Sequence, residues 1–175
     1  VLNGERFDDA HRRGLALADE RGLTMIDPFD DDAVIAGQGT IGMEMLRAEL
    51  DLDELVIPVG GGGLIAGIAT AAKHLKPGIV VTGVQVERFA LVYDALKGTE
   101  HPVGAGSIAE GIAVNRLGNR TLPMIRERVD DVMLVDEGDI ERAILMLLEI
   151  EKTVVEGAGA AGLAAVLRDP ARFRD

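Results

Sequence analysis

Apolar and polar residues follow one another along the chain in blocks that predict strands and helices in turn. Residues 54–59 are mostly apolar and read as a buried strand, and the small apolar residues after Gly63 read as a helix. Residues 79–86 form a second, mostly apolar run, which is typical of a buried parallel strand. This order of strand, helix and strand predicts a complete βαβ unit.

The flanking segments carry the same kinds of signal. Helical spacing of apolar residues predicts further helices over Phe7–Arg21, residues 40–50, Thr121–Arg128, residues 139–152 and residues 158–167. Residues 23–26 and 132–135 read as additional strands. Together these elements predict a single α/β domain over residues 1–175, with a mostly parallel sheet and helices on both faces.

Helix ends and one helix face give more specific expectations. The acids within residues 27–32 precede a helical stretch and suit its positive end. Asp136 is expected to cap the helix over residues 139–152. In the helix predicted over residues 40–50, the apolar side chains are expected to pack against the sheet: Ile41, Met43, Met45, Leu46 and Leu50.

Four consecutive glycines, Gly60, Gly61, Gly62 and Gly63, separate the first strand of the βαβ unit from its helix. Without Cβ atoms such a loop lets its amide N–H groups approach an anion, and the helix that follows adds a partial positive charge. A flexible turn is the alternative interpretation, but turns seldom need four glycines in a row. The sequence therefore favours a phosphate site at this loop.

A dinucleotide fingerprint, G-x-G-x-x-G/A, competes with this interpretation. Gly61, Gly63 and Ala66 match it after a strand, and Glu87 could serve as its ribose-binding acid. Residues 157–162 match it to the letter, but they follow a helical stretch and too few residues remain for a second strand. We interpret that second match as close helix packing. The first match leaves a nicotinamide-binding domain open as an alternative.

Composition and charge favour a small-molecule ligand. Thirty acidic residues against 18 basic ones leave a formal charge of −12, which repels nucleic acids and anionic membranes. The chain has no cysteine, which excludes disulfides, thiol catalysis and thiolate metal sites, and its three histidines are far apart. No stretch predicts a membrane span or a signal peptide, so we expect a cytoplasmic protein with neither nucleic-acid nor membrane partners.

A third motif, at residues 107–114, interrupts an apolar run with an acid and a glycine, Glu110 and Gly111. Ser107 is the only serine of the chain, and no aspartate and histidine accompany it in a recognisable nucleophile motif. We therefore do not expect serine catalysis. By itself, Glu110 could equally be a solvated loop acid.

Four strings occur in the order seen in threonine and serine dehydratases: AVIAGQGTIG at residues 33–42, VGGGGLIAG at 59–67, SIAEGIAV at 107–114 and VVEGAG at 154–159. With these strings the chain resembles the large domain of those enzymes, which depend on pyridoxal 5'-phosphate (PLP) and have the tryptophan-synthase-β fold, fold type II. The resemblance spans essentially the whole chain. It implies an incomplete fold type II large domain that lacks its N-terminal and C-terminal portions.

The resemblance also implies a cofactor site and a reaction. It assigns the PLP phosphate to the amides of the four glycines and Leu64, and it places Gly111 and Glu156 near the cofactor ring. Such enzymes convert threonine to 2-oxobutanoate and ammonia, and serine to pyruvate, by α,β-elimination. An amino-acid substrate and a homo-oligomer of the complete protein are therefore expected.

The catalytic lysine of these enzymes lies in a Ser-x-Lys motif that has no match here. The four lysines, Lys73, Lys76, Lys97 and Lys152, each read as a helix-end charge. We therefore expect no Schiff-base lysine and no activity from this chain alone. A phosphate-binding module without catalysis remains an alternative.

Some relatives bind a divalent cation through acids that follow the strand after the glycine loop. In this sequence Gln85 and Leu91 take those positions, and only Glu87 offers a carboxylate nearby. The expectation is that the chain has no such metal site.

Overall fold

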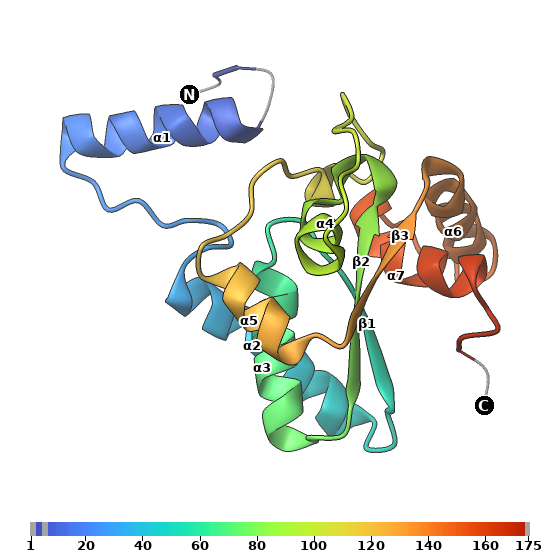
Figure 1. Cartoon of the computed structure of the whole chain (residues 1–175). Coiled ribbons are helices and arrows are strands. Elements are labelled where there is room, and N and C mark those ends of the chain that lie inside the picture. The colour runs from blue at the N-terminus through green and yellow to red at the C-terminus, as the bar shows by residue number, and fades with distance from the viewer. Residues whose placement is uncertain (1–2, 5–6, 174–175) are drawn as a thin grey trace.

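The computed structural model describes residues 3–4 and 7–173 of the chain (Figure 1). Its elements follow in this order: α1 (Phe7–Arg21), α2 (Asp32–Ala48), β1 (Glu54–Pro58), α3 (Gly63–Leu75), β2 (Val80–Val86), the 3-10 helix η1 (Glu87–Phe89), α4 (Leu91–Lys97), the 3-10 helix η2 (Glu110–Ile112), α5 (Thr121–Arg128), β3 (Asp131–Val135), α6 (Glu137–Glu149) and α7 (Gly157–Arg168). The βαβ unit predicted around the glycine loop is confirmed.

The three strands form one parallel sheet in the order β1, β2, β3. Val80 of β2 lies opposite Glu54 of β1, and Thr82 of β2 lies opposite Asp131 of β3. Six of the seven residues of β2 are buried, as expected for a central strand that is covered on both faces. Parallel pairing brings the carboxyl ends of the strands to one edge of the sheet, where the glycine loop follows β1.

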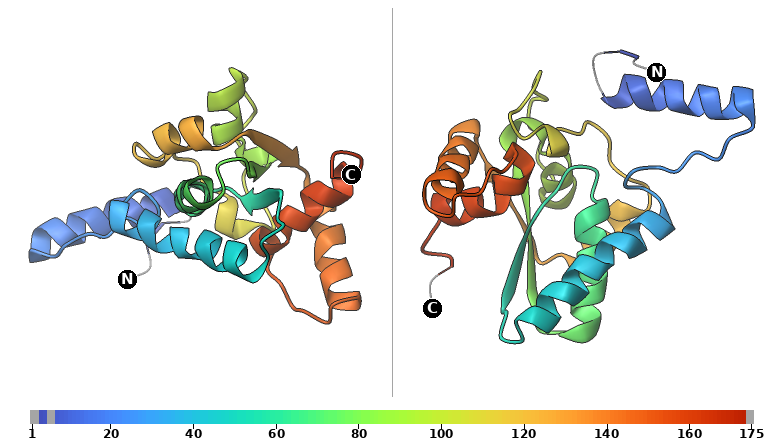
Figure 2. Two further views of the ribbon diagram at one scale, coloured as in Figure 1. Left: turned by 90° about the horizontal axis from the view of Figure 1, so that it is seen from below. Right: turned by 180° about the vertical axis from the view of Figure 1, so that it is seen from behind.

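Helices cover both faces of this sheet, as the sequence predicted (Figures 1 and 2). On one face α3 packs against the strands, with α2 and α5 packed on α3. On the other face α7 contacts all three strands and carries α6 on its outer side. Among the helices of the described residues, none combines the length and the apolar character that a membrane crossing requires.

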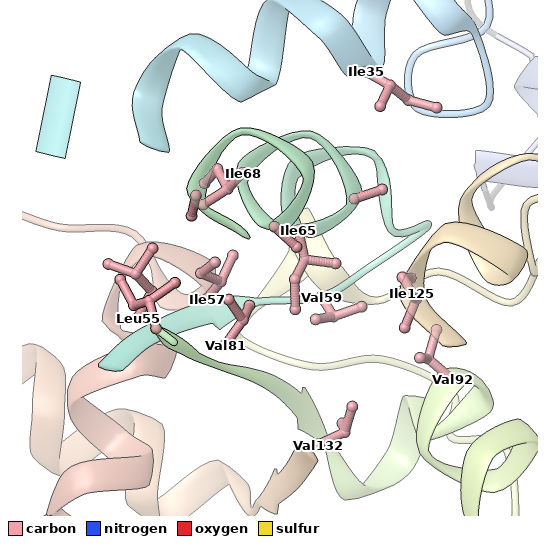
Figure 3. Packing of buried hydrophobic residues seen from close by; sticks show 14 of the residues in the cluster. Ile35, Leu55, Ile57, Val59, Ile65, Ile68, Val81, Val92, Ile125 and Val132 are labelled. Atoms are coloured by element: carbon pink, nitrogen blue, oxygen red, sulfur yellow. The ribbon is translucent and has the colours of Figure 1, made fainter. Parts of the chain in front are cut away.

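The larger hydrophobic cluster lies between the sheet and α3 (Figure 3). Ile65 and Ile68 of α3 pack over side chains of β1 and β2 that point to the same face. The second cluster is built largely from small side chains of α7, including Ala160, Ala161 and Ala164. Alanines let α7 approach the sheet closely, which explains the alanine-rich sequence of this helix.

Close contact between α2 and α3 depends on glycine. A Cβ atom on Gly67 of α3 would collide with the backbone carbonyl of Ile35 in α2, and one on Gly39 would lie 3.0 Å from the carbonyl oxygen of Gly67. The helix predicted over residues 40–50 begins earlier, at Asp32, and Gly39 lies on its face towards α3. Asp31 caps this helix by accepting from two amides, so the expected acidic start is confirmed.

Two sequence predictions are wrong, one about the packing of a helix and one about a strand. The apolar face of residues 40–50 was expected on the sheet, but α2 packs on α3 instead, which leaves Ile41 and Met45 partly exposed and Leu50 beyond the helix end. Residues 23–26 form no strand, because no strand of the described sheet lies beside this extended connection. Local pattern alone does not supply a pairing partner.

At the start of α6 the sequence prediction is confirmed. Asp136 accepts from the amide of Asp139, and the Asp139 carboxylate accepts from the amide of Asp136, which completes a capping box. The helix spans Glu137–Glu149, so it starts and ends a few residues before the predicted bounds.

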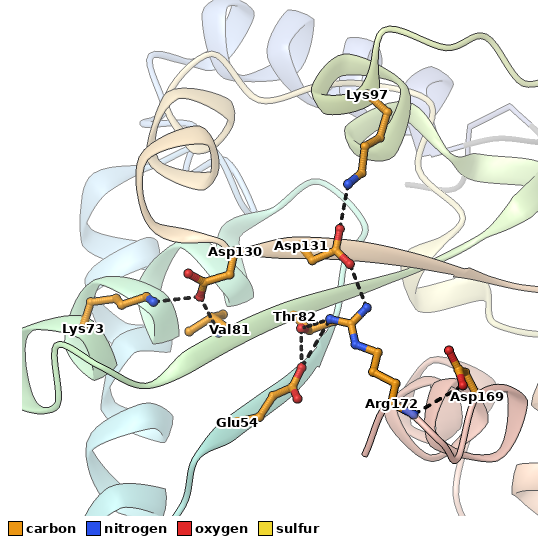
Figure 4. Close-up of polar contacts among 9 residues, drawn as sticks. All are labelled: Glu54, Lys73, Val81, Thr82, Lys97, Asp130, Asp131, Asp169 and Arg172. Carbon is orange, nitrogen blue, oxygen red and sulfur yellow. Dashed lines mark hydrogen bonds and ion pairs between the residues drawn. The ribbon is translucent and has the colours of Figure 1, made fainter. Parts of the chain in front are cut away.

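Charged side chains join the amino ends of the strands (Figure 4). Arg172, beyond α7, donates to Asp131 of β3 at 2.7 Å and to the hydroxyl of Thr82 in β2 at 2.9 Å. Thr82 in turn donates to Glu54 of β1 at 2.5 Å. This network ties all three strands to the segment after α7, at the edge opposite the glycine loop.

Candidate cofactor site

A cleft of about 570 Å³ opens at the carboxyl end of β1. Its lining comes from the glycine loop and from segments distant in sequence: Pro28, Phe29, Gln38, Pro58, Gly60, Gly61, Gly62, Gly63, Leu64, Glu110, Gly111, Ile112, Ala113, Val114, Glu156, Ala158 and Gly159. All seven residues that the sequence assigns to cofactor binding therefore line one cleft. In parallel α/β sheets this edge is the usual place for a ligand.

The backbone of the glycine loop is suited to an anion. Within the described part of the chain, no group accepts a hydrogen bond from the amides of Gly60, Gly61, Gly62, Gly63 or Leu64. Helix α3 begins at Gly63 with no side-chain cap and with no acid in its first turn, so its positive end is uncompensated. A phosphate group would supply the missing acceptors, and the residues present fit one.

Three of the glycines are required by geometry, and a Cβ on Gly63 would lie 2.8 Å from the backbone oxygen of Phe29. Gly62 has φ +93°, a left-handed conformation that residues with a Cβ rarely adopt, and a Cβ there would lie 2.7 Å from Ile125. A Cβ on Gly61 would collide with the ring of Phe29. Side chains from other segments, Phe29 and Ile125, therefore pack against the loop, and it is not a flexible turn.

Phe29 and its neighbours support the loop. The guanidinium group of Arg116 lies over the Phe29 ring, 4.4 Å from its centroid, and donates to Asp27 at 2.7 Å. Asp27 also accepts from the amides of Phe29 and Asp30, which fixes the turn that carries the ring. His11 of α1 lies 3.1 Å from the same carboxylate, so Asp27 joins three parts of the chain.

The environment of Asp27 perturbs its titration. Burial alone would raise the pKa of this carboxyl, but the hydrogen bonds from Asp30, Phe29 and Arg116 and the positive charge of Arg116 outweigh burial. The pKa falls from its ordinary value of 3.8 to about 2. Asp27 is therefore ionised throughout the physiological range.

A pH prediction follows for Asp27. Because its pKa is lower in the folded chain, the ionised carboxylate contributes stability that is complete above about pH 4 and is lost as the pH falls towards 2. Replacing Asp27 with asparagine should remove a contribution on the order of 1–2 kcal/mol from the free energy of unfolding at neutral pH. Denaturant unfolding at several pH values measures this contribution. Between about pH 4 and 2, the free energy of unfolding of the variant should depend less steeply on pH than that of the original chain. The same pH dependence in the variant and the original chain would contradict the lowered pKa of Asp27.

The far wall of the cleft is formed by η2 and the start of α7. Glu110 and Gly111 lie in η2, so this motif lines a pocket wall. Glu156 caps α7 by accepting from the amides of Ala158 and Gly159 at 3.0 and 2.9 Å. A Cβ on Gly111 would lie 3.1 Å from that of Ala158, which explains the close approach of the two segments.

Residues 157–162, which match the dinucleotide fingerprint in sequence, lie in α7, and their interpretation as a close helix contact is confirmed. The residues directly before the match, 150–156, form no strand. A Cβ on Gly157 would collide with the carbonyl of Ile108, and one on Gly162 would lie 3.2 Å from the carbonyl oxygen of Val56. Gly157 lets α7 pack against residues 108–109, just before η2, and Gly162 lets it pack against β1.

Glu87 does not behave as a ribose-binding acid. It begins η1, lies outside the lining of the cleft and accepts a hydrogen bond from Arg168 at 3.0 Å. Gln85 is 1% exposed; its side chain donates to the carbonyl of Val59 and accepts from the amide of Tyr93. No group of three or more acidic or histidine residues that could hold a metal ion occurs within the described ranges.

None of the four lysines lines the cleft. Lys73 pairs with Asp130 at 2.7 Å, and Lys97 pairs with Asp131 at 2.8 Å. The ammonium groups of the other two lysines donate to backbone carbonyls, that of Lys76 to Leu52 and that of Lys152 to Glu149. Each lysine thus has a partner close to the end of a helix or strand.

A second surface depression, also of about 570 Å³, lies at the other edge of the sheet. Its basic residues Lys73, His74 and Arg128 fall in the last turns of α3 and α5, where positive charge balances the negative helix ends. Lys73 and Arg128 also pair with neighbouring acids. The charges are accounted for without a ligand, which leaves the glycine-loop cleft as the candidate site.

Three cleft contributors escaped the sequence analysis: Phe29, Gln38 and Thr121. Phe29 and Gln38 line the cleft, while Thr121 donates to the backbone carbonyl of Gly61 behind it. Gln38 lies within the quoted string at residues 33–42, which was the available signal, whereas Phe29 lies outside all four strings. Thr121 had no local signal, because its contact joins residues that are 60 positions apart.

Comparison with curated proteins finds relatives named L-threonine ammonia-lyase and L-threonine dehydratase. The chain is 43% identical over 169 residues to the L-threonine ammonia-lyase of Thermotoga maritima, covering 95% of this chain and 42% of that protein. It is 43% identical over 170 residues to the catabolic L-threonine dehydratase TdcB of Escherichia coli, covering 95% and 51%. The chain thus spans about half the length of the curated relatives it matches.

Solved structures agree in fold. A threonine deaminase from T.th. superimposes with a TM-score of 0.88 at 40% identity, covering 98% of this chain and 58% of that one. Maize serine racemase gives a TM-score of 0.89 at 31% identity, covering 99% and 55%. A family model described as "Pyridoxal-phosphate dependent enzyme" matches residues 1–175. Because this match covers the whole chain and the sheet has helices on both faces, this chain belongs to the pyridoxal-phosphate dependent enzyme family.

Proposed function

We propose that the protein containing this chain is a PLP-dependent threonine ammonia-lyase, which converts threonine to 2-oxobutanoate and ammonia and acts on serine as a secondary substrate. The observation that carries the proposal is the run of five amides without acceptors in the described residues at the end of β1, within a cleft whose lining carries the dehydratase motifs. Relatives named for threonine ammonia-lyase and threonine dehydratase support this choice of reaction.

Each part of the cleft has a role in this proposal. The amides of Gly60, Gly61, Gly62, Gly63 and Leu64 bind the PLP phosphate, and the positive end of α3 adds to that attraction. Gly111 and Glu156, whose carboxylate is fixed by the α7 amides, line the cleft and would lie near the cofactor ring. When bound, PLP acts as the electron sink for removal of the α-proton and the β-hydroxyl.

The proposal assigns only part of the catalytic machinery to this chain. We infer that residues 1–175 form one α/β domain of a larger catalytic unit, whose other portion supplies the Schiff-base lysine. We further propose a cytoplasmic homo-oligomer. β1 and β3 are the edge strands of the described sheet, and such edges favour association with further chain.

A phosphate-binding module without catalysis is the second candidate. The specific observation in its favour is that no lysine lines the cleft in the described part of the chain. A third, a nicotinamide-binding domain, is disfavoured by the pairing of Glu87 with Arg168. Glu87→Ala should therefore leave phosphate binding unchanged.

The decisive experiment supplies threonine and PLP to the complete product of the gene. Formation of 2-oxobutanoate and ammonia, with slower formation of pyruvate from serine, is the expected result, and the 175-residue chain alone should give neither. Racemised amino acid without ammonia would replace the lyase proposal with a racemase. PLP binding without any turnover by the complete product would favour the non-catalytic module.

A further inference from the structure

The hydroxyl group of Thr121 touches the glycine loop from behind. Thr121 is the first residue of α5 and is 1% exposed, and its Oγ1 donates to the backbone carbonyl of Gly61 at 2.8 Å. The residue is absent from the lining of the cleft, so it does not face the space that a ligand would fill. Thr121 can therefore act on a bound ligand only through the loop.

That hydrogen bond fixes more than one carbonyl. A trans peptide group is planar, so its C=O and N–H point in opposite directions. When Thr121 holds the carbonyl of Gly61 towards α5, the amide N–H of Gly62 is turned away from α5. Gly62 is one of the five loop residues whose amides have no acceptor within the described part of the chain, and it lines the cleft.

Thr121 is itself held in place by the turn before α2. The Asp30 carboxylate accepts from the amides of Asn119, Arg120 and Thr121 at 2.9, 2.8 and 3.3 Å. One helical turn further on, Ile125 packs against the position that a Cβ on Gly62 would occupy. The start of α5 thus has a fixed position relative to the loop.

We propose that Thr121 is a positioning residue for the phosphate of PLP, orienting the Gly62 amide through the carbonyl of Gly61. This inference rests on the proposed function, since it takes PLP as the ligand. Its consequence concerns selectivity. Thr121 strengthens binding of the phosphorylated cofactor and contributes nothing to binding of pyridoxal, which lacks the phosphate.

The test compares dissociation constants for PLP and pyridoxal in the complete gene product. Thr121→Val keeps the shape of the side chain and removes the donor, and should raise the dissociation constant for PLP by about fivefold to tenfold, as expected for one oriented hydrogen bond. The constant for pyridoxal should change by less than about twofold. Thr121→Ser keeps the hydroxyl and should bind both ligands like the original protein.

Thr82→Val is the matched control. Thr82 is also fully buried, and its hydroxyl donates to Glu54 at the opposite edge of the sheet. This variant should lose stability and keep the ratio of the two dissociation constants.

The outcomes separate the inference from the proposed function. Equal affinity of the original protein for PLP and pyridoxal would overturn the proposed phosphate site itself. Preference for PLP that survives in Thr121→Val, or equal weakening of both ligands, would overturn the role of Thr121 alone. If the valine variant does not fold, Thr121→Ser is the remaining test. Its ratio of the dissociation constants for pyridoxal and PLP must stay within about twofold of the original ratio, and a larger change would overturn the inference.

Discussion

Replacing Gly61 with alanine should weaken PLP binding by about tenfold to a hundredfold, because the added methyl group has no space. The new Cβ would collide with the ring of Phe29, which is held by the Arg116 guanidinium group above it and by the turn that Asp27 fixes. Relief requires the loop to shift, and forced repacking of this kind costs about 1–3 kcal/mol. Fluorescence titration with PLP measures the change.

Gly78→Ala is the matched control for this prediction. An added Cβ on Gly78 meets no atom within 4 Å, and its backbone is not left-handed. The control should bind PLP as the original protein does. If both alanine variants bind PLP equally well, the glycine loop is not the phosphate site.

Replacing Gly67 with alanine should lower the free energy of unfolding by about 1–3 kcal/mol, even though alanine is the better helix former. Gly67 lies in the middle of α3, where α2 crosses so closely that a Cβ would collide with the carbonyl of Ile35 and would lie 2.7 Å from the amide nitrogen of Gly39. Backbone atoms cannot rotate away as a side chain can, so the helices must separate. Chemical denaturation measures the effect.

Gly37→Ala in the facing helix α2 has the opposite expectation. No atom lies within 4 Å of a Cβ built on Gly37, so the substitution should raise the free energy of unfolding by up to about 1 kcal/mol through helix propensity. If Gly67→Ala and Gly37→Ala changed the free energy of unfolding in the same direction, the close packing of α2 on α3 would not depend on Gly67.

Sequence periodicity predicted the parts of the fold that depend on local pattern. The βαβ unit was predicted well because β2 is buried along nearly its whole length and the run between residues 79 and 86 is mostly apolar. Asp136 could be predicted as a cap because aspartate is preferred directly before a helix, where its side chain accepts from a free amide of the first turn. The site motifs were located for the same reason, since they are contiguous in sequence.

Contacts between distant segments could not be predicted in this way. The helix predicted over residues 40–50 left out the first turns of α2, because glycine is a poor helix former and the contact of Gly39 with α3 is not visible in the local sequence. Residues 23–26 have the composition of a strand but no partner strand in the described sheet. Phe29 and Thr121 act on the glycine loop from segments whose local sequence gives no sign of it.

The most direct measurement follows the backbone amides of the ¹⁵N-labelled 175-residue chain during titration with PLP. The proposed phosphate site predicts that the amide resonances of Gly60, Gly61, Gly62, Gly63 and Leu64, which have no acceptor within the described residues, shift most strongly. Pyridoxal should leave these five resonances nearly unmoved. Strong shifts confined to the opposite edge of the sheet, near Lys73 and Arg128, or no shifts in the glycine loop at saturating PLP, would contradict the site.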